Sequence, residues 1–238
     1  MRTFGLIGRN LEYSFSSQYF NKKICEEKIT DAQYLNFELK EISEFKLLIE
    51  RNKLSGLNIT IPYKEAIIPF LDELSKEAKS IGAVNTIRFS NEKLIGYNTD
   101  YLGFINSIQP LLKGRNKAII LGNGGAAKAI KYALQKLSIE YKTVNRNTSF
   151  DYLDITKEIT GYHTIIINTT PVGSYPKTDE TPNIPYEYLN EDYLLFDLIY
   201  NPYETKFLAY GKARNTQIKN GLEMLQIQAE ESWKIWNL

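Results

Sequence analysis

The chain has 238 residues, of which 43% are hydrophobic, so it can bury the core of one large domain or two smaller ones. Its 29 Lys and Arg residues balance 28 Asp and Glu residues, which argues against a nucleic-acid partner because no global basic field exists. The single cysteine, Cys25, excludes an internal disulfide framework, and the single histidine, His163, excludes a histidine-based metal cluster. We therefore expect no metal cofactor.

The N-terminal stretch "MRTFGLIGRN" has too short an apolar run for a signal peptide. No apolar run approaches the roughly 20 residues that a membrane-spanning helix needs. We expect a soluble, cytoplasmic protein without a membrane partner.

Short apolar runs alternate with helical patterns along the whole chain. Helices are indicated at 42–52 and 126–137 and strands at 3–8, 32–39, 56–62, 117–122, 141–145, 164–170 and 193–200. Strands separated by helices imply crossover connections, so the sequence predicts an α/β fold with mostly parallel sheets.

The first block of elements, residues 1 to about 100, carries an unusual lysine. Thr60 alternates with apolar neighbours on the third predicted strand, and Pro62 ends the pairing because proline has no N–H. Lys64 then stands at the predicted start of a helix, where the helix dipole disfavours a cation. Such a local misfit indicates function, and the alternative is an ordinary surface lysine.

Short polar side chains follow several other apolar runs of this block. Asn85 lies in "GAVNT" and Asp100 in "GYNTD", while Ser14 and Ser16 share one face if "EYSFS" is extended. Such side chains suit a small ligand that carries several hydroxyl groups. A lysine beside an aspartate could move a proton, with the amine as acid or base and the carboxylate orienting it.

The second block opens with a nucleotide-binding pattern. "KAIILGNGGAAKAI" reads as a strand, a glycine turn and a helix start, and Gly122, Asn123, Gly124 and Ala127 fit G-x-G-x-x-G/A. The turn lets the backbone approach a pyrophosphate, which the N–H groups of the helix N-terminus bind. The alternative is an ordinary strand–helix turn.

The end of the next strand favours NADP over NAD. NAD-binding domains usually carry Asp or Glu there for the ribose 2′-hydroxyl, whereas this chain has Asn145 and Arg146. An arginine attracts a 2′-phosphate that a carboxylate would repel. The following strand ends in "NTTPVGS", where Asn168 stands at a ligand-binding edge or in a structural turn.

The last helical pattern, 221–236, is amphipathic, with apolar residues at Leu222, Leu225, Ala229, Trp233 and Trp236. A helix with so apolar a face must dock on another element.

Taken in order, these motifs resemble the shikimate dehydrogenase family. The resemblance covers nearly the whole chain and rests on "YSFSSQYFN", "GLNITIPYKE", "GAVNT", "GYNTDYLGF", "LGNGGAAKA", "NRN", "NTTPVGS", "DLIYNPYETKFL" and "GLEMLQIQA". It implies an α/β fold with two domains: a substrate domain of 1–100 plus 221–238, to which the C-terminal helix returns, and a Rossmann-type NADP-binding domain of 101–220. The family reduces 3-dehydroshikimate to shikimate with NADPH, on the route to chorismate and the aromatic amino acids.

The resemblance also implies roles for individual residues. Lys64 is expected to be the catalytic acid and base, with Asp100 as its partner. The expected substrate contacts are Ser14 and Ser16 to the carboxylate, then Thr60, Asn85, Asp100 and Gln228 to the ring hydroxyls, and Tyr200 in the same cleft. The expected cofactor contacts are Gly122, Asn123, Gly124, Gly125 and Ala126 to the pyrophosphate, Asn145 and Arg146 to the adenosine end, and Leu198 and Gly221 to the nicotinamide.

The chain departs from the family pattern at several positions. Tyr13 replaces the usual His, Ser17 replaces the usual Pro, and "GRN" replaces G-x-P. The family often has a second arginine soon after the position of Arg146, whereas here the next basic residue is Lys157. This departure predicts weaker binding of the 2′-phosphate than in the family.

Three other functions stay open from the sequence: a relative acting on quinate, one acting on an aminated shikimate, and a regulatory protein that binds the cofactor without catalysis. The partner is expected to be a small molecule, and the protein a monomer or homodimer.

Overall fold

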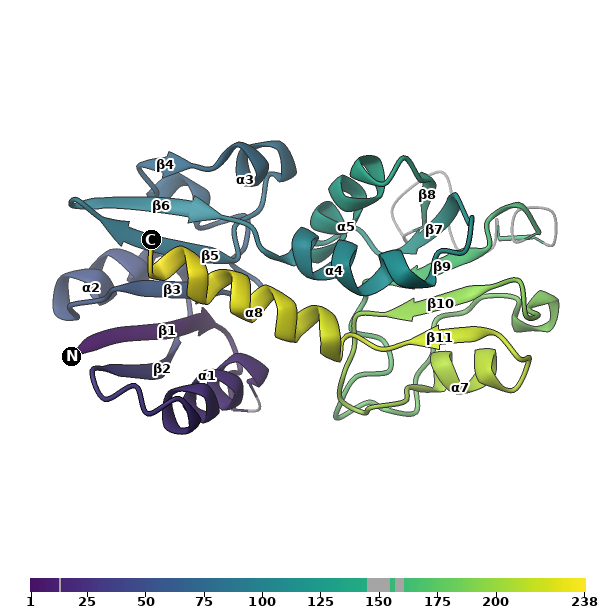
Figure 1. The fold of residues 1–238 in the computed structure, drawn as a ribbon, viewed down its shortest axis with the longest axis horizontal. Helices are drawn as coiled ribbons and strands as arrows, with labels where there is room; N and C mark the ends of the chain where they lie inside the picture. Colours follow the sequence, from purple (N-terminus) through teal and green to yellow (C-terminus); the bar gives the residue numbers. More distant parts are fainter. Residues whose placement is uncertain (13, 145–154, 157–160) are drawn as a thin grey trace. The chain divides into compact units, whose positions relative to one another are not determined.

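The computed structural model describes residues 1–12, 14–144, 155–156 and 161–238. The chain divides into two compact units, one made of Met1–Asp100 with Gln226–Leu238 and the other of Tyr101–Leu225 (Figure 1). The predicted α/β class with two domains is confirmed. The substrate and cofactor roles assigned to the two domains stay a prediction.

The first unit is built on a six-stranded sheet with the order β2-β1-β3-β5-β6-β4. Its elements are β1 (Arg2–Gly8), α1 (Phe15–Glu26), β2 (Ala32–Glu38), η1 (Ile42–Glu44), α2 (Phe45–Arg51), β3 (Gly56–Ile59), η2 (Ile68–Phe70), β4 (Glu73–Leu74), α3 (Lys76–Ile81), β5 (Thr86–Ser90) and β6 (Lys93–Tyr97). Most of α8 (Leu222–Trp236) also belongs to this unit.

The expectation of mostly parallel sheets is confirmed, since three of the five strand pairs of the first unit are parallel, but β5 runs antiparallel to both β3 and β6. The sequence interpretation missed the β5–β6 hairpin. Its two-residue turn is formed by Asn91 and Glu92, both with positive φ, which suits the twist of a tight hairpin. Glutamate is rare in that conformation, and here it stands where the usual Asn-Gly turn would have glycine. The sequence therefore carries no standard hairpin signal at this place.

Strand alternation divides the core of the first unit between the two faces of the sheet. On β1, Phe4 and Leu6 pack with α1 and α8, whereas Ile7 packs with α2 on the opposite face. On β3, Leu57 and Ile59 also face the α2 side. The polar residue between them, Asn58, is 3% exposed and therefore needs partners of its own.

Helix α8, drawn in yellow in Figure 1, lies along this sheet and carries the predicted apolar face. The Trp236 ring stacks on Phe4 with ring centroids 4.8 Å apart and lies 5.2 Å from Phe20 of α1. Its indole N–H donates to the carbonyl of Ile87 at 3.0 Å. A large aromatic surface with a satisfied N–H gives α8 a fixed docking position.

The second unit is built on a five-stranded, fully parallel sheet with the order β11-β10-β9-β7-β8. Its elements are α4 (Asp100–Ile108), η3 (Gln109–Leu111), β7 (Lys117–Leu121), α5 (Gly125–Lys136), β8 (Glu140–Val144), β9 (Ile165–Asn168), η5 (Tyr186–Tyr188), β10 (Leu194–Asp197), α7 (Lys206–Lys212) and β11 (Gln217–Lys219). After β8 the chain crosses to the other side of β7, so the strand order reverses between β7 and β9.

Helices cover both faces of the second sheet. Ala118 and Ile120 of β7 pack with α4 and α5, while Ile119 and Leu121 pack with α7 on the other face. This layering is the Rossmann-type arrangement.

Three predicted strands are shorter than expected: the runs 56–62, 164–170 and 193–200 form strands only over Gly56–Ile59, Ile165–Asn168 and Leu194–Asp197. The ends that leave the sheet contain Pro62 in the first run and Thr169 and Thr170 in the second, whereas in the third run the apolar residues 198–200 follow the buried Asp197 into a loop.

A polar clamp joins α8 to α1. The Tyr19 hydroxyl and the Lys23 amine both donate to the Glu230 carboxylate, the amine at 2.9 and 3.1 Å. Burial works to raise the pKa of Glu230, but the hydrogen bonds from Tyr19 and Lys23 outweigh it and lower that pKa. The ionised carboxylate is therefore favoured in the folded state.

We expect Glu230→Gln to lower the free energy of unfolding by about 0.5–1 kcal/mol at pH 7. The effect is small because the site is partly exposed and solvent screens the charges. A lowered folded pKa means that this contribution is present above the carboxyl's unfolded pKa and is lost as the pH falls through the folded value. Denaturant unfolding at pH 7 and pH 3.5 should therefore show a difference from wild type that is smaller at the lower pH. Glu231→Gln, next along α8 and paired with the exposed Lys234, is the matched control. An equal loss at both pH values would contradict the clamp.

Candidate functional site

Polar candidates of the first unit gather at one edge of its sheet. The parallel strands β1 and β3 end there, and the open end of the β5–β6 hairpin lies there too, because Thr86 pairs with both Asn58 and Tyr97. The residues that flank these strand ends are Ser14, Thr60, Asn85 and Asp100.

Lys64 and Asp100 form an ion pair at this edge. Lys64 Nζ donates to Asp100 Oδ2 at 2.6 Å, and the side chains are only 15% and 6% exposed. Asp100 is the first residue of α4, where the helix dipole favours a carboxylate. The amine is thus held in one direction, while the Lys64 side chain as a whole stays partly exposed.

The expectation that Lys64 begins a helix is wrong. Lys64 lies in a turn ahead of η2, and its carbonyl accepts from the N–H of Val84 at 2.7 Å. An α-helix could not run on from here, because Pro69 lacks an N–H and its ring would clash with the carbonyl of Glu65. The ion pair, and not a conflict with a helix dipole, is what distinguishes this lysine.

Asn85 holds the pair from behind. Its side-chain amide donates to Asp100 Oδ1 and Thr99 Oγ1, both at 2.9 Å, and to Gln228 Oε1 at 3.2 Å. Its Oδ1 accepts from the N–H of Thr99 at 2.7 Å. The two carboxylate oxygens of Asp100 are therefore divided between Lys64 and Asn85, which fixes the carboxylate plane.

Sequence reasoning missed a second layer of this network. Asn58 donates to Ser232 Oγ at 3.1 Å and accepts from the Tyr34 hydroxyl at 2.8 Å, while Ser232 shares a 2.7 Å hydrogen bond with Thr86. All four side chains are buried. The available signal was an asparagine between two apolar residues of a buried strand, which must find hydrogen-bond partners.

Gln228 enters the network from α8. Its Oε1 accepts from Asn85 and, at 3.4 Å, from Thr99, and its side chain is 5% exposed. The structure thus brings Lys64, Asn85, Asp100 and Gln228 into one hydrogen-bonded cluster.

The condition under which Ser14 and Ser16 would share one face, an extended segment, is not met. Ser14 is the N-cap of α1 and accepts from the N–H of Ser17 at 3.3 Å, so Ser16 already lies in the first helical turn. Serine is among the best N-cap residues, which explains why the helix begins here. Ser16 also hydrogen-bonds Tyr34, whose pKa is raised well above its usual value by burial. Thr60 packs its methyl group over Gly8.

The glycine turn of the second unit has the geometry that a dinucleotide needs. Gly122 has a φ of +106°, and a Cβ there would lie 2.8 Å from Thr169 Oγ1, so only glycine fits. A Cβ at Gly124 would meet no protein atom within 4 Å, so packing does not demand glycine there, whereas a close pyrophosphate would. Gly125 and Ala126 then begin α5, whose first N–H groups face the turn that follows the carboxyl end of β7. These residues fit a dinucleotide phosphate.

Three other cofactor candidates lie in the second unit, and two lie outside the residues that the structure describes. The Asn123 side chain accepts from Lys131 at 2.5 Å, which turns it along α5. Leu198 follows β10, and Gly221 donates its N–H to the carbonyl of Ile199 at 3.0 Å. Asn145 and Arg146 lie outside the described residues. Tyr200 belongs to the second unit, whereas the other substrate candidates belong to the first.

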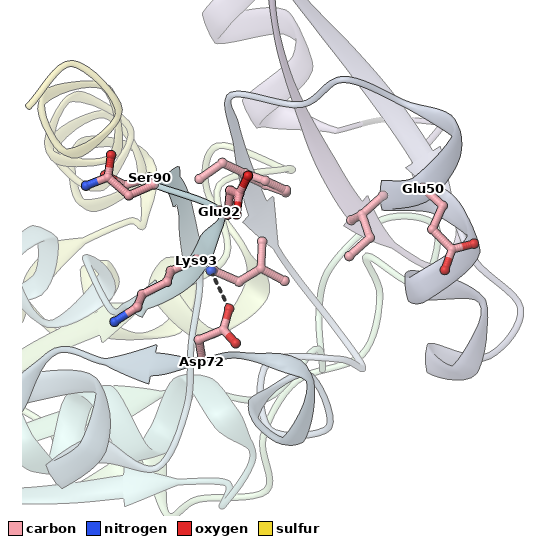
Figure 2. A pocket seen from close by; sticks show the side chains of 9 residues that line it. Glu50, Asp72, Ser90, Glu92 and Lys93 are labelled. Carbon is pink, nitrogen blue, oxygen red and sulfur yellow. Dashed lines mark hydrogen bonds between the residues drawn. The ribbon is translucent and has the colours of Figure 1, made fainter.

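A separate pocket of about 490 Å³ lies at the far end of the β5–β6 hairpin (Figure 2). Figure 2 labels Glu50, Asp72, Ser90, Glu92 and Lys93 among the lining residues, and Asp72 accepts from the N–H of Leu94 at 2.7 Å. The pocket shares no lining residue with the Lys64 cluster.

Among the residues that the structure describes, no group of three His, Cys, Asp or Glu side chains converges so as to hold a metal ion. Over the same residues, each helix is too short or too polar to cross a membrane.

Comparison with known proteins shows similarity over the full length. Residues 6–87 match the family model of the shikimate dehydrogenase substrate binding domain. The shikimate dehydrogenase (NADP(+)) of Clostridium beijerinckii is 40% identical over 253 residues, covering 99% of this chain and 92% of the relative. That of Methanococcus maripaludis is 38% identical, covering 98% and 90%.

Solved structures agree. Shikimate dehydrogenase from Aquifex aeolicus superposes with a TM-score of 0.89 at 34% identity, covering 100% of this chain and 92% of that one. The Thermus thermophilus enzyme in complex with NADP(H) and shikimate gives 0.85 at 28% identity, covering 99% and 93%. The chain therefore belongs to the shikimate dehydrogenase family.

Proposed function

We propose that this chain is an NADP-dependent shikimate dehydrogenase, which reversibly reduces 3-dehydroshikimate to shikimate on the route to chorismate and the aromatic amino acids. The observation that carries the proposal is the Lys64–Asp100 pair, held at 2.6 Å within a buried network at a sheet edge. Full-length similarity to enzymes of this name supports the same substrate and cofactor.

The proposed chemistry uses few groups of this chain. NADPH, when bound, supplies the hydride. Lys64, as an ammonium, donates a proton to the substrate oxygen that gains negative charge, and neutral Lys64 accepts a proton in the reverse direction. Asp100 keeps the amine oriented and balances its charge, and Asn85 keeps Asp100 in place.

The proposed recognition of substrate follows the polar edge of the first unit. Ser14 and Ser16 would bind the carboxylate, while Thr60, Asn85, Asp100 and Gln228 would bind ring hydroxyls; Tyr200 is a further candidate. The network orients Asn85, Asp100 and Gln228, so they need little rearrangement to bind a ligand.

The proposed cofactor contacts are Gly122 to Ala126 for the pyrophosphate, Asn145 and Arg146 for the 2′-phosphate end, and Leu198 and Gly221 for the nicotinamide. The protein would need no metal. A cytoplasmic location and a monomeric or homodimeric state remain predictions from the sequence.

The direct test is absorbance at 340 nm with purified protein and shikimate, with NADP and NAD in parallel cuvettes. We expect a rise with NADP. The same assay is run with quinate in place of shikimate. A rise only with quinate would make quinate the substrate, and no rise with either acid would favour a binding protein without catalysis.

Lys64→Ala should lower kcat for shikimate oxidation by about 10³-fold, within the range of a positioned acid–base group, while the KM for shikimate changes only severalfold. Lys93→Ala is the matched control, because Lys93 also pairs with a carboxylate, Glu73, but is 56% exposed. Turnover of Lys64→Ala within twofold of wild type would refute the assignment.

Arg146→Ala should lower kcat/KM for NADP by about 10- to 100-fold and leave kcat/KM for NAD unchanged, because a charge-assisted contact to the 2′-phosphate is lost. Lys142→Ala, which removes an exposed charge from the preceding strand β8, should leave the preference as it is. An unchanged NADP/NAD ratio in Arg146→Ala would show that another group reads the 2′-phosphate.

A further inference from the structure

Asp197 is a carboxylate buried at the end of β10. It is 0% exposed and accepts three hydrogen bonds, from Asn168 Nδ2 at 3.1 Å, from the N–H of Ile199 at 3.1 Å and from Thr205 Oγ1 at 2.6 Å. Burial raises the pKa of this carboxyl to about 6, while the three hydrogen bonds act to lower it. A buried charge is costly, so its retention calls for an explanation.

The three partners lie on three different segments. Asn168 ends the neighbouring strand β9, Ile199 belongs to the loop after β10, and Thr205 is the N-cap of α7, where it accepts from the N–H of Leu208. One carboxylate therefore fixes the starts of two loops and a helix.

Asn168 passes this constraint on to the loop after β9. Its Oδ1 accepts from the N–H of Thr170 at 3.0 Å and from its hydroxyl at 2.6 Å, and its Nδ2 donates to the carbonyl of Val172 at 3.3 Å. The turn 169–172 is thus shaped by the side chain that Asp197 orients.

The loop after β10 is braced from a second side. A Cβ at Gly221 would lie 2.1 Å from the carbonyl oxygen of Leu198, so this close approach of two backbones requires glycine. Together with the hydrogen bond from Gly221 to Ile199, this leaves the segment 198–199 little freedom.

Sheet topology places these loops on the path of a dinucleotide. In open α/β sheets a dinucleotide crosses the carboxyl ends of the strands where the strand order reverses, which here is between β7 and β9. The glycine turn after β7 contacts Thr169 of the loop after β9. With the adenosine half on the β8 side, the other half must extend over the ends of β9 and β10.

We propose that Asp197 is a positioning residue for NADP: it sets the loops 169–172 and 198–200 that receive the nicotinamide half of the cofactor. This inference rests on the proposed function. Asp197 itself lies beneath the loops, so it acts through Asn168, Ile199 and Thr205 and not by contact with the cofactor.

The test compares the whole cofactor with a fragment that lacks the nicotinamide, adenosine 2′,5′-bisphosphate. Asp197→Ala leaves three donors unpaired, and we expect kcat/KM for NADP to fall at least 30-fold, with the Kd of the fragment, measured by calorimetry, within twofold of wild type. Asp197→Asn keeps an acceptor oxygen for Asn168 and Ile199, and should recover most of the loss.

Two threonine variants keep the test valid if Asp197→Ala does not fold, which thermal melting will show. Thr205→Val removes one donor to Asp197 and should lower kcat/KM for NADP severalfold. Thr216→Val is the control: it removes another buried threonine's hydroxyl, bonded to the carbonyl of Asn190 at the opposite end of the strands, and should change nothing.

The outcomes separate the two proposals. A wild-type chain that does not oxidise shikimate counts against the proposed function. A wild-type chain that does, together with Asp197→Ala within threefold of it, overturns the role of Asp197 alone. Equal losses in NADP kinetics and in fragment binding also overturn it, because they indicate general damage to the second unit.

Discussion

The hydrogen-bonded network around Asn85 is the constraint on which the first unit depends. Its members come from β3, β5, the start of α4 and the C-terminal helix α8, and each is buried. A buried polar atom left without a partner costs about 1–3 kcal/mol, so these elements are stable only in one mutual register. The direction of the Lys64 amine follows from that register, because Asp100 is oriented by Asn85 and not by Lys64 alone.

Both units use one physical solution at the edge where strands end. The carboxylate oxygens of Asp100 and Asp197 accept hydrogen bonds from several segments beyond the strand ends, where the backbone hydrogen bonds of the sheet have stopped. In the first unit the carboxylate of Asp100 stays close enough to the surface for its lysine to remain 15% exposed. In the second, Asp197 lies wholly inside. Depth thus separates a group that can meet a ligand from one that can only shape the backbone around it.

Periodicity and glycine spacing predicted whole elements, whereas two turns of unusual sequence and the contacts between distant residues were not predicted. The β7–turn–α5 unit and the amphipathic α8 followed from periodicity and glycine spacing, and Asn85 and Asp100 stood out as polar residues after apolar runs. Lys64 was singled out by a helix start that does not exist, although the ion pair with Asp100 does. The β5–β6 hairpin was missed because its turn contains no glycine, and the turn at Lys64 because the proline that prevents a helix, Pro69, stands five residues further along the chain. Asn58, Thr86 and Ser232 gain meaning only when β3, β5 and α8 meet, which no local pattern encodes.

The division of the chain has a consequence for its synthesis. All residues of the second unit, Tyr101–Leu225, leave the ribosome before Gln226–Leu238, on which the first unit depends. Until those last residues emerge, Phe4 and Phe20 lack their Trp236 neighbour, and Asn58 lacks the Ser232 hydroxyl. The N-terminal sheet, although made first, is therefore completed last, and the nascent chain carries an uncovered apolar face for most of its translation. A chaperone that binds such faces would meet this protein early and release it only after residues 226–238 have left the ribosome.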